Sequence, residues 1–192
     1  ENLCYQIYDT PDLVDAMFER IGSIFHEVAK VLVQFDRLPI IFGGDDMGFK
    51  TGPMVTPQVL IEKSFPWHKW NAELAHTHDK LYILHACGNL SDLMESLIHY
   101  VKIDGRHSFE DVIEPVTLAK ERYGDHIAVI GGIDLDFLCR SSEVAIRQRV
   151  RHTLDVCLPG GGYCLGTGNS VANYIPVENY LVMMDEGRRY MD

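Results

Sequence analysis

Short apolar runs alternate with amphipathic stretches along the whole chain. One amphipathic stretch follows Asp9 or Thr10, carries Pro11 in its first turn and repeats apolar residues at helical spacing as far as Val31. The apolar runs each end in polar residues or glycine and predict strands at residues 38–42, 81–84, 101–104, 127–130 and 163–165. Because parallel neighbours need helical crossovers, apolar strands alternating with helices indicate a parallel sheet. The pattern predicts an α/β chain of about five strand–helix units.

Two architectures are compatible with five such units. A (β/α)8 barrel needs more strands than these, but it gathers polar residues at the carboxyl ends of its strands, as this chain does. An open doubly wound sheet holds five strands comfortably and binds ligands at the same ends. The pattern alone favours neither a partial barrel nor an open sheet.

Charge and composition narrow the classes of function. The 192 residues are 46% hydrophobic and 23% charged, an ordinary balance for one globular domain. A net charge of -11 repels phosphate backbones and anionic lipids, so we expect neither nucleic acid nor a membrane as a partner. Five cysteines in a chain of this size suit a reducing compartment. We therefore expect a cytoplasmic protein whose thiols are available to bind metal.

Three candidate metal ligands lie on two of the predicted strands or just beyond them: His85, Cys87 and Cys164. In a strand, residues i and i+2 project to the same side, so His85 and Cys87 can share one ion. Cys164 belongs to the last predicted strand, and the strands of a closed barrel surround one mouth. An imidazole with two thiolates suits Zn²⁺ and leaves one coordination position for a substrate. The alternative is a hydrogen-bonded histidine with two small core cysteines.

Further polar residues at strand ends are candidates for the same site. Asp45 and Asp46 follow the first predicted strand and are candidate catalytic carboxylates, although an Asp-rich turn can also satisfy its own backbone. Asp134 is either a hydrogen-bond partner of His85 or a helix-start carboxylate. A fourth, displaceable metal ligand could be Asp104, His107 or Glu110, which lie in one segment. The alternative is that this segment is a solvated loop with a helix-capping serine.

Four segments resemble the C-terminal part of the uroporphyrinogen decarboxylase superfamily: Gly43-Gly44-Asp45-Asp46-Met47-Gly48, Ile83-Leu84-His85-Ala86-Cys87-Gly88-Asn89, Ile130-Gly131-Gly132-Ile133-Asp134, and Pro176 with Glu178-Asn179-Tyr180. His-x-Cys followed by a distant Cys resembles the corrinoid-linked methyltransferase branch, of the methylcobamide:coenzyme M methyltransferase type. In that branch these three residues bind zinc, which here implies His85, Cys87 and Cys164. The resemblance also implies a barrel of about twice this length, so residues 1–192 form a single partial (β/α)8 barrel domain.

The function that the resemblance implies is a zinc-dependent methyl transfer. A corrinoid carried by a partner protein would exchange a methyl group with a small thiol acceptor or a methoxylated donor. A metal-free decarboxylase is the runner-up, but a decarboxylase would be expected to show a histidine between glycines at Gly166-Thr167-Gly168-Asn169. A truncated, non-catalytic member is a third possibility. We also expect a missing N-terminal segment or a second chain to complete the barrel and cover the strand at residues 38–42.

Overall fold

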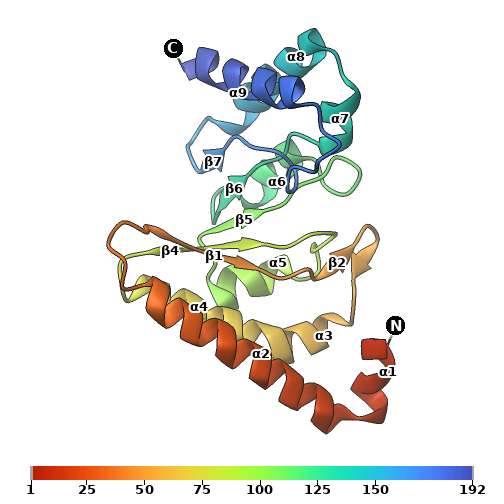
Figure 1. Cartoon of the computed structure of the whole chain (residues 1–192), viewed down its shortest axis with the longest axis vertical. Coiled ribbons are helices and arrows are strands. Elements are labelled where there is room, and N and C mark those ends of the chain that lie inside the picture. The colour runs from red at the N-terminus through yellow and green to blue at the C-terminus, as the bar shows by residue number, and fades with distance from the viewer. Residues whose placement is uncertain (1, 192) are drawn as a thin grey trace.

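The structure is a computed structural model that describes residues 2–191, and it contains one parallel sheet with helices packed along it (Figure 1). The elements in chain order are α1 Asn2–Asp9, α2 Pro11–Leu32, β1 Ile40–Gly44, β2 Gly48–Phe49, β3 Gly52–Pro53, α3 Pro57–Val59, the π-helical turn η1 Leu60–Ser64, α4 Phe65–His76, β4 Leu81–His85, α5 Met94–Ser96, the π-helical turn η2 Leu97–Val101, β5 Gly105–His107, α6 Val116–Tyr123, β6 Ala128–Ile130, α7 Leu135–Arg140, α8 Glu143–Cys157, β7 Tyr163–Cys164 and α9 Val177–Met191. The short strands β2 and β3 form a separate antiparallel pair.

The strand order identifies the architecture. The five-stranded sheet runs β1-β4-β5-β6-β7, all parallel and in the order of the chain. A doubly wound sheet reverses its order at a switch point, whereas a barrel adds each strand on the same side. Right-handed crossovers in one direction put the connecting helices on one face, and α2 and α4 lie together along β1 and β4 in Figure 1. The fold is therefore a segment of a (β/α)8 barrel, as predicted, and not an open doubly wound sheet.

Four of the five predicted strands are confirmed with ends shifted by a few residues, and one prediction is wrong. The sequence predicts a strand at residues 101–104, but η2 ends at Val101 and β5 begins at Gly105. Val101 and Ile103 are buried in the core, so this apolar run belongs to a helical turn and a loop. Asp104 consequently precedes its strand instead of ending it.

The two faces of the sheet differ in burial. One face packs under the helices in two apolar clusters, the first including Ile41, Phe65 and Leu84 and the second lying around β6, α8 and α9. The other face is open at the β1 end, where Ile40 is 41% exposed and Phe42 59% exposed. Because alternate residues of a barrel strand point inward, this open face is the inner face of the barrel.

Helix α2 forms as predicted, but most of its apolar face is exposed. Its buried positions are Val14, Gly22 and Ala29, while several other apolar side chains are 42–60% exposed: Met17, Ile21, Ile24, Phe25, Val28 and Val31. A Cβ atom at Gly22 would lie 2.1 Å from the ring of Trp67, so α2 and α4 touch closely there. Within residues 2–191, β4 is the one strand that pairs with β1, and no helix is both long and apolar enough to cross a membrane.

Candidate metal centre

The pairing of β1 with β4 brings two chemistry-bearing segments together. Gly44 lies opposite His85 in the register, and the backbone N–H of Asp45 donates to the carbonyl of His85 at 3.0 Å. The residues that follow both strands therefore meet at the carboxyl edge of the sheet, where a barrel holds its active site. Asp45 and Asp46 come from the β1 side and Cys87 from the β4 side.

Asp46, His85 and Cys87 form the centre of this edge. One ligand atom of each lies within 4.8 Å of the ligand atoms of the other two. His85 Nε2 is 3.3 Å from Cys87 Sγ. A tetrahedral zinc with a 2.0–2.1 Å bond to nitrogen and a 2.3 Å bond to sulfur would separate these two atoms by about 3.5 Å. The imidazole and the thiol thus already have the spacing that a shared zinc ion requires.

The two adjacent aspartates face different ways. Asp45 accepts a hydrogen bond from Ser64 Oγ at 2.7 Å and contacts His68 Nε2 at 3.1 Å, both on the helical side. Burial acts to raise the pKa of Asp45, but the bonds from His68 and Ser64 outweigh it and hold that pKa below its ordinary value. Asp45 therefore ties the end of β1 to α4, and Asp46 is the aspartate that reaches the centre.

His107 lies directly beside His85 on the neighbouring strand. The two residues are opposite each other in the register, and their Nδ1 atoms are 2.6 Å apart. His107 Nε2 donates to the carbonyl of Thr167 at 3.0 Å. Burial lowers the pKa of His107. Both ring nitrogens of His107 are thus engaged by the protein, so this side chain supports His85 and is not placed as a separate ligand.

Asn169 joins Cys87 to Glu110. Its side-chain amide donates to Cys87 Sγ at 3.3 Å and to Glu110 Oε1 at 3.0 Å. Burial, and then the neighbouring Asp46, raise the pKa of the Cys87 thiol above its ordinary value. A bound cation would reverse this effect, because it stabilises the thiolate. Glu110, one of the predicted fourth ligands, is therefore close to the centre, but the side chain of Asn169 lies between it and Cys87.

A cavity of about 630 Å³ opens next to these residues, and Glu110 and Asn169 form part of its wall. Its other walls include Asp134, Phe137 and Tyr174. This volume is in the range of small-molecule sites. Cys87 does not line the cavity, and Asn169 is the residue that links the cavity wall to the thiol of Cys87.

Two of the predicted ligands are not brought to this centre. Cys164 is exposed on β7, and β5 and β6 lie between β7 and β4. Cys164 is not in the group whose ligand atoms all lie within 4.8 Å of one another. Asp104 lies at the opposite end of β5, where its carboxylate accepts from the N–H of Tyr82 and contacts His76, both at 2.7 Å. The prediction that Asp104 could be the fourth ligand is wrong, because Asp104 precedes its strand.

Other candidates have structural roles. Asp134 caps α7 by accepting from the N–H of Phe137 at 3.0 Å, which is the helix-start role and not a contact with His85. Cys157 is buried in the second apolar cluster. Trp67 packs against Trp70 within α4, with ring centroids 4.7 Å apart.

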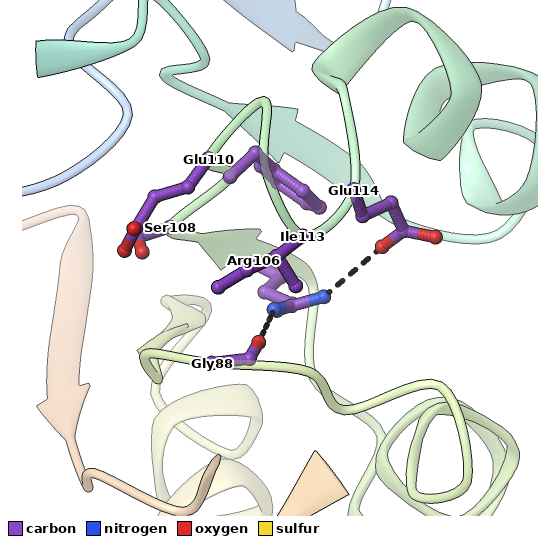
Figure 2. Close-up of a pocket in the computed structure, with 7 residues that line it drawn as sticks. Gly88, Arg106, Ser108, Glu110, Ile113 and Glu114 are labelled. Atoms are coloured by element: carbon purple, nitrogen blue, oxygen red, sulfur yellow. Dashed lines mark hydrogen bonds and ion pairs between the residues drawn. The ribbon is translucent and has the colours of Figure 1, made fainter. Parts of the chain in front are cut away.

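Arg106 supports the turn that follows Cys87 from the helical side of the sheet (Figure 2). Its side chain is 2% exposed, donates to the carbonyl of Gly88 at 3.2 Å and pairs with Glu114 at 3.6 Å. Gly88 has φ +84°, and a Cβ there would lie 2.2 Å from the backbone of Gly48, so this position requires glycine. Arg106 therefore anchors a tight turn next to a candidate ligand.

Sequence reasoning missed the roles of three residues. In the sequence Asn169 stands out only as the last residue of Gly166-Thr167-Gly168-Asn169, where the position between the glycines is Thr167, and its approach to Cys87 depends on the loop after β7. Arg106 is adjacent to a predicted candidate, which is a usable signal, because a charged residue in a buried strand needs a specific partner. His68 stands one helical turn after Ser64, a spacing that puts both side chains on the same helix face.

Comparison with known proteins places the chain in a family. Residues 1–190 match the family described as uroporphyrinogen decarboxylase (URO-D), and no curated protein matches the chain. A solved methyltransferase from Methanosarcina mazei is similar, with a TM-score of 0.74 and 17% identity, over 98% of this chain and 52% of that one. The chain thus spans about half the length of that methyltransferase, and at this identity the likeness is one of fold. From its match over nearly all residues, the chain belongs to the uroporphyrinogen decarboxylase family.

Proposed function

We propose that this chain carries the metal centre of a zinc-dependent methyltransferase, which moves a methyl group between a corrinoid cobalt and a small thiol or methoxylated substrate. The observation that carries the proposal is the meeting of Asp46, His85 and Cys87 at the carboxyl edge of a barrel segment. The methyltransferase name of the similar Methanosarcina mazei structure supports the same class of reaction. The corrinoid would come with a partner protein.

The donor set fits zinc. An imidazole, a thiolate and a carboxylate are all ligands that zinc accepts, and a catalytic zinc keeps three protein ligands with one open position. With His85 neutral and the other two ligands ionised, the charges of the protein ligands balance the two charges of the ion. Geometry favours Asp46 over Cys164 as the third ligand, because Asp46 is already within reach of both other ligands.

Each residue then has a defined task. Zinc, when bound, supplies Lewis acidity: it activates either the thiol sulfur that accepts the methyl group or the oxygen atom that gives the methyl group up. His85, Cys87 and Asp46 hold the ion, and the Asn169 amide donates to the Cys87 sulfur at 3.3 Å. The cavity beside Glu110 and Asn169 holds the small substrate. The open mouth of the barrel is where a corrinoid protein would dock.

The metal is tested first. Full-length protein purified without chelators should contain about one zinc per chain, since three protein ligands and one open position are the usual catalytic arrangement. Cys87→Ala and Asp46→Asn should lose most of it, because two remaining ligands hold zinc poorly. Cys157→Ala, a buried cysteine far from the centre in the fold, is the matched control and should keep its zinc. Zinc contents unchanged in both Cys87→Ala and Asp46→Asn would overturn the metal assignment.

The reaction is tested by the absorption bands of cobalt. The full-length protein would be incubated with methylcob(III)alamin and a panel of thiols, and separately with cob(I)alamin and a panel of methyl ethers and methanol. We expect turnover in one direction that stops when zinc is removed and returns when it is restored. No zinc-dependent turnover in either direction, together with decarboxylation of uroporphyrinogen, would establish the runner-up function.

A further inference from the structure

The two histidines at the centre differ in what surrounds them, and this difference determines where their protons lie. His107 Nε2 is 3.0 Å from the carbonyl oxygen of Thr167, which can only accept a hydrogen bond. His107 Nε2 must therefore carry a proton. In the neutral ring this leaves His107 Nδ1 without one, so Nδ1 is an acceptor.

The acceptor of His107 points at His85. The two Nδ1 atoms are 2.6 Å apart, which is a hydrogen bond with one proton between them. Since His107 Nδ1 accepts, His85 Nδ1 donates. The neutral ring of His85 then has no proton on Nε2, and this bare nitrogen is the atom that lies 3.3 Å from Cys87 Sγ. The chain of bonds thus begins at a backbone carbonyl and ends with a lone pair directed at the candidate metal position.

We propose that His107 is a positioning residue, which holds His85 in the tautomer protonated on Nδ1 and so presents His85 Nε2 as a ready metal ligand. This inference rests on the proposed metal centre and deepens it by assigning the residue that prepares one ligand. Metal-bound histidines usually donate their second ring nitrogen to a carbonyl or carboxylate. Here the acceptor is the imidazole of His107, whose own orientation is fixed by its hydrogen bond to the carbonyl of Thr167.

The position of His107 in the fold supports the role. It lies opposite His85 in the β4–β5 register, so the strand pairing fixes the distance between the rings. The ring centroids are 4.8 Å apart, and Phe42 contacts both rings at 6.4–6.5 Å between centroids. The backbone of Thr167 also passes over Gly131, where a Cβ would lie 2.4 Å from the Thr167 oxygen. Both ends of the bond chain are therefore held by the backbone of the sheet.

The tautomer of His85 is the direct test. Full-length protein labelled with ¹⁵N in histidine would be freed of metal, and His85 assigned by comparison with His85→Gln. Long-range ¹⁵N–¹H correlations should show His85 protonated on Nδ1 and bare on Nε2. In His107→Phe this preference should be lost, whereas exposed His99→Phe should leave it intact. A His85 protonated on Nε2 in the wild-type protein, or an unchanged tautomer in His107→Phe, would overturn the proposal.

Zinc affinity provides the second readout. By competition with a chromophoric chelator, we expect His107→Phe to weaken zinc binding about 10- to 100-fold, the usual loss for a partner of a metal ligand. His107→Gln should lose less, because its amide can still accept from His85. Equal affinities for wild type and His107→Phe would contradict the proposal. If the wild-type protein binds no zinc, the proposed function fails by itself, and the tautomer measurement still decides the role of His107.

Discussion

Removing the carboxylate partner of Arg106 should destabilise the protein strongly. Arg106 is 2% exposed, and Glu114 at 3.6 Å is its charged partner among the described residues. Its remaining contacts are neutral: the Gly88 carbonyl at 3.2 Å, Met94 Sδ at 3.7 Å and the ring of Phe109 at 4.7 Å. Its Nε atom has no hydrogen-bond partner within residues 2–191. In Glu114→Gln the guanidinium would stay buried without a counter-charge.

The expected loss follows from this environment. Removing one member of a buried ion pair costs about 3–5 kcal/mol, and we expect about 3 kcal/mol because glutamine keeps an oxygen that can accept from Arg106. Arg106→Met should cost less, about 1–2 kcal/mol. In that variant Glu114 keeps Arg122 at 3.1 Å, and the buried guanidinium is replaced by an apolar side chain of similar length. The double variant should cost less than the sum of the two single changes.

Urea unfolding of the full-length protein measures these free energies. Glu114→Gln should lower the midpoint without changing the slope, which indicates a change in stability alone. Glu95→Gln is the matched control, because its side chain is 89% exposed and its contact with His99 lies on the surface. A Glu114→Gln protein within about 0.5 kcal/mol of wild type, the usual range for surface changes, would show that Arg106 does not depend on the charge of Glu114.

Three further predictions test the packing, the centre and the open face. Gly22→Ala should lower the thermal midpoint through an overpacking cost of about 1–3 kcal/mol, since its Cβ would lie 2.1 Å from Trp67; an unchanged midpoint would show that the helices separate freely. Asn169→Ala should weaken zinc binding about 10- to 100-fold in a chelator competition, because it removes the amide that bonds Cys87 Sγ at 3.3 Å; equal affinity would count against that role. Residues 2–191 expressed alone should associate through the exposed face of α2 and the free edge of β1, and Val28→Lys should reduce association in sedimentation velocity. A monodisperse monomer would contradict this last expectation.

Local sequence patterns were sufficient to predict the α/β fold class. Identifying the sheet as a barrel segment also required the order of the strands, which the structure provides. Apolar runs followed by polar residues mark strands well where the strand is buried and the helices on either side are regular. The strand predicted at residues 101–104 was wrong because Val101, at the end of η2, and Ile103, in the loop after it, are buried in the apolar core just as strand residues are. Periodicity over four residues cannot separate a buried loop from a buried strand.

The part of the site that could be predicted from the sequence is the part that lies at the end of a single strand. His85 and Cys87 come together through the alternation of a single strand end, which the sequence displays directly. The choice between Asp45 and Asp46 depends on which aspartate turns toward α4, and this is set by His68 and Ser64. Cys164 could not be placed from sequence, because its distance from His85 depends on how strongly the sheet curves between β4 and β7.

X-ray absorption at the zinc edge of the full-length wild-type protein would identify the atoms around a zinc ion held by His85, Cys87 and Asp46. We expect one sulfur neighbour at about 2.3 Å, with the remaining nitrogen and oxygen neighbours at about 2.0–2.2 Å. Two sulfur neighbours would replace Asp46 by Cys164 as the third ligand. Zinc without any sulfur neighbour, or protein that binds no zinc, would contradict this assignment of the metal centre.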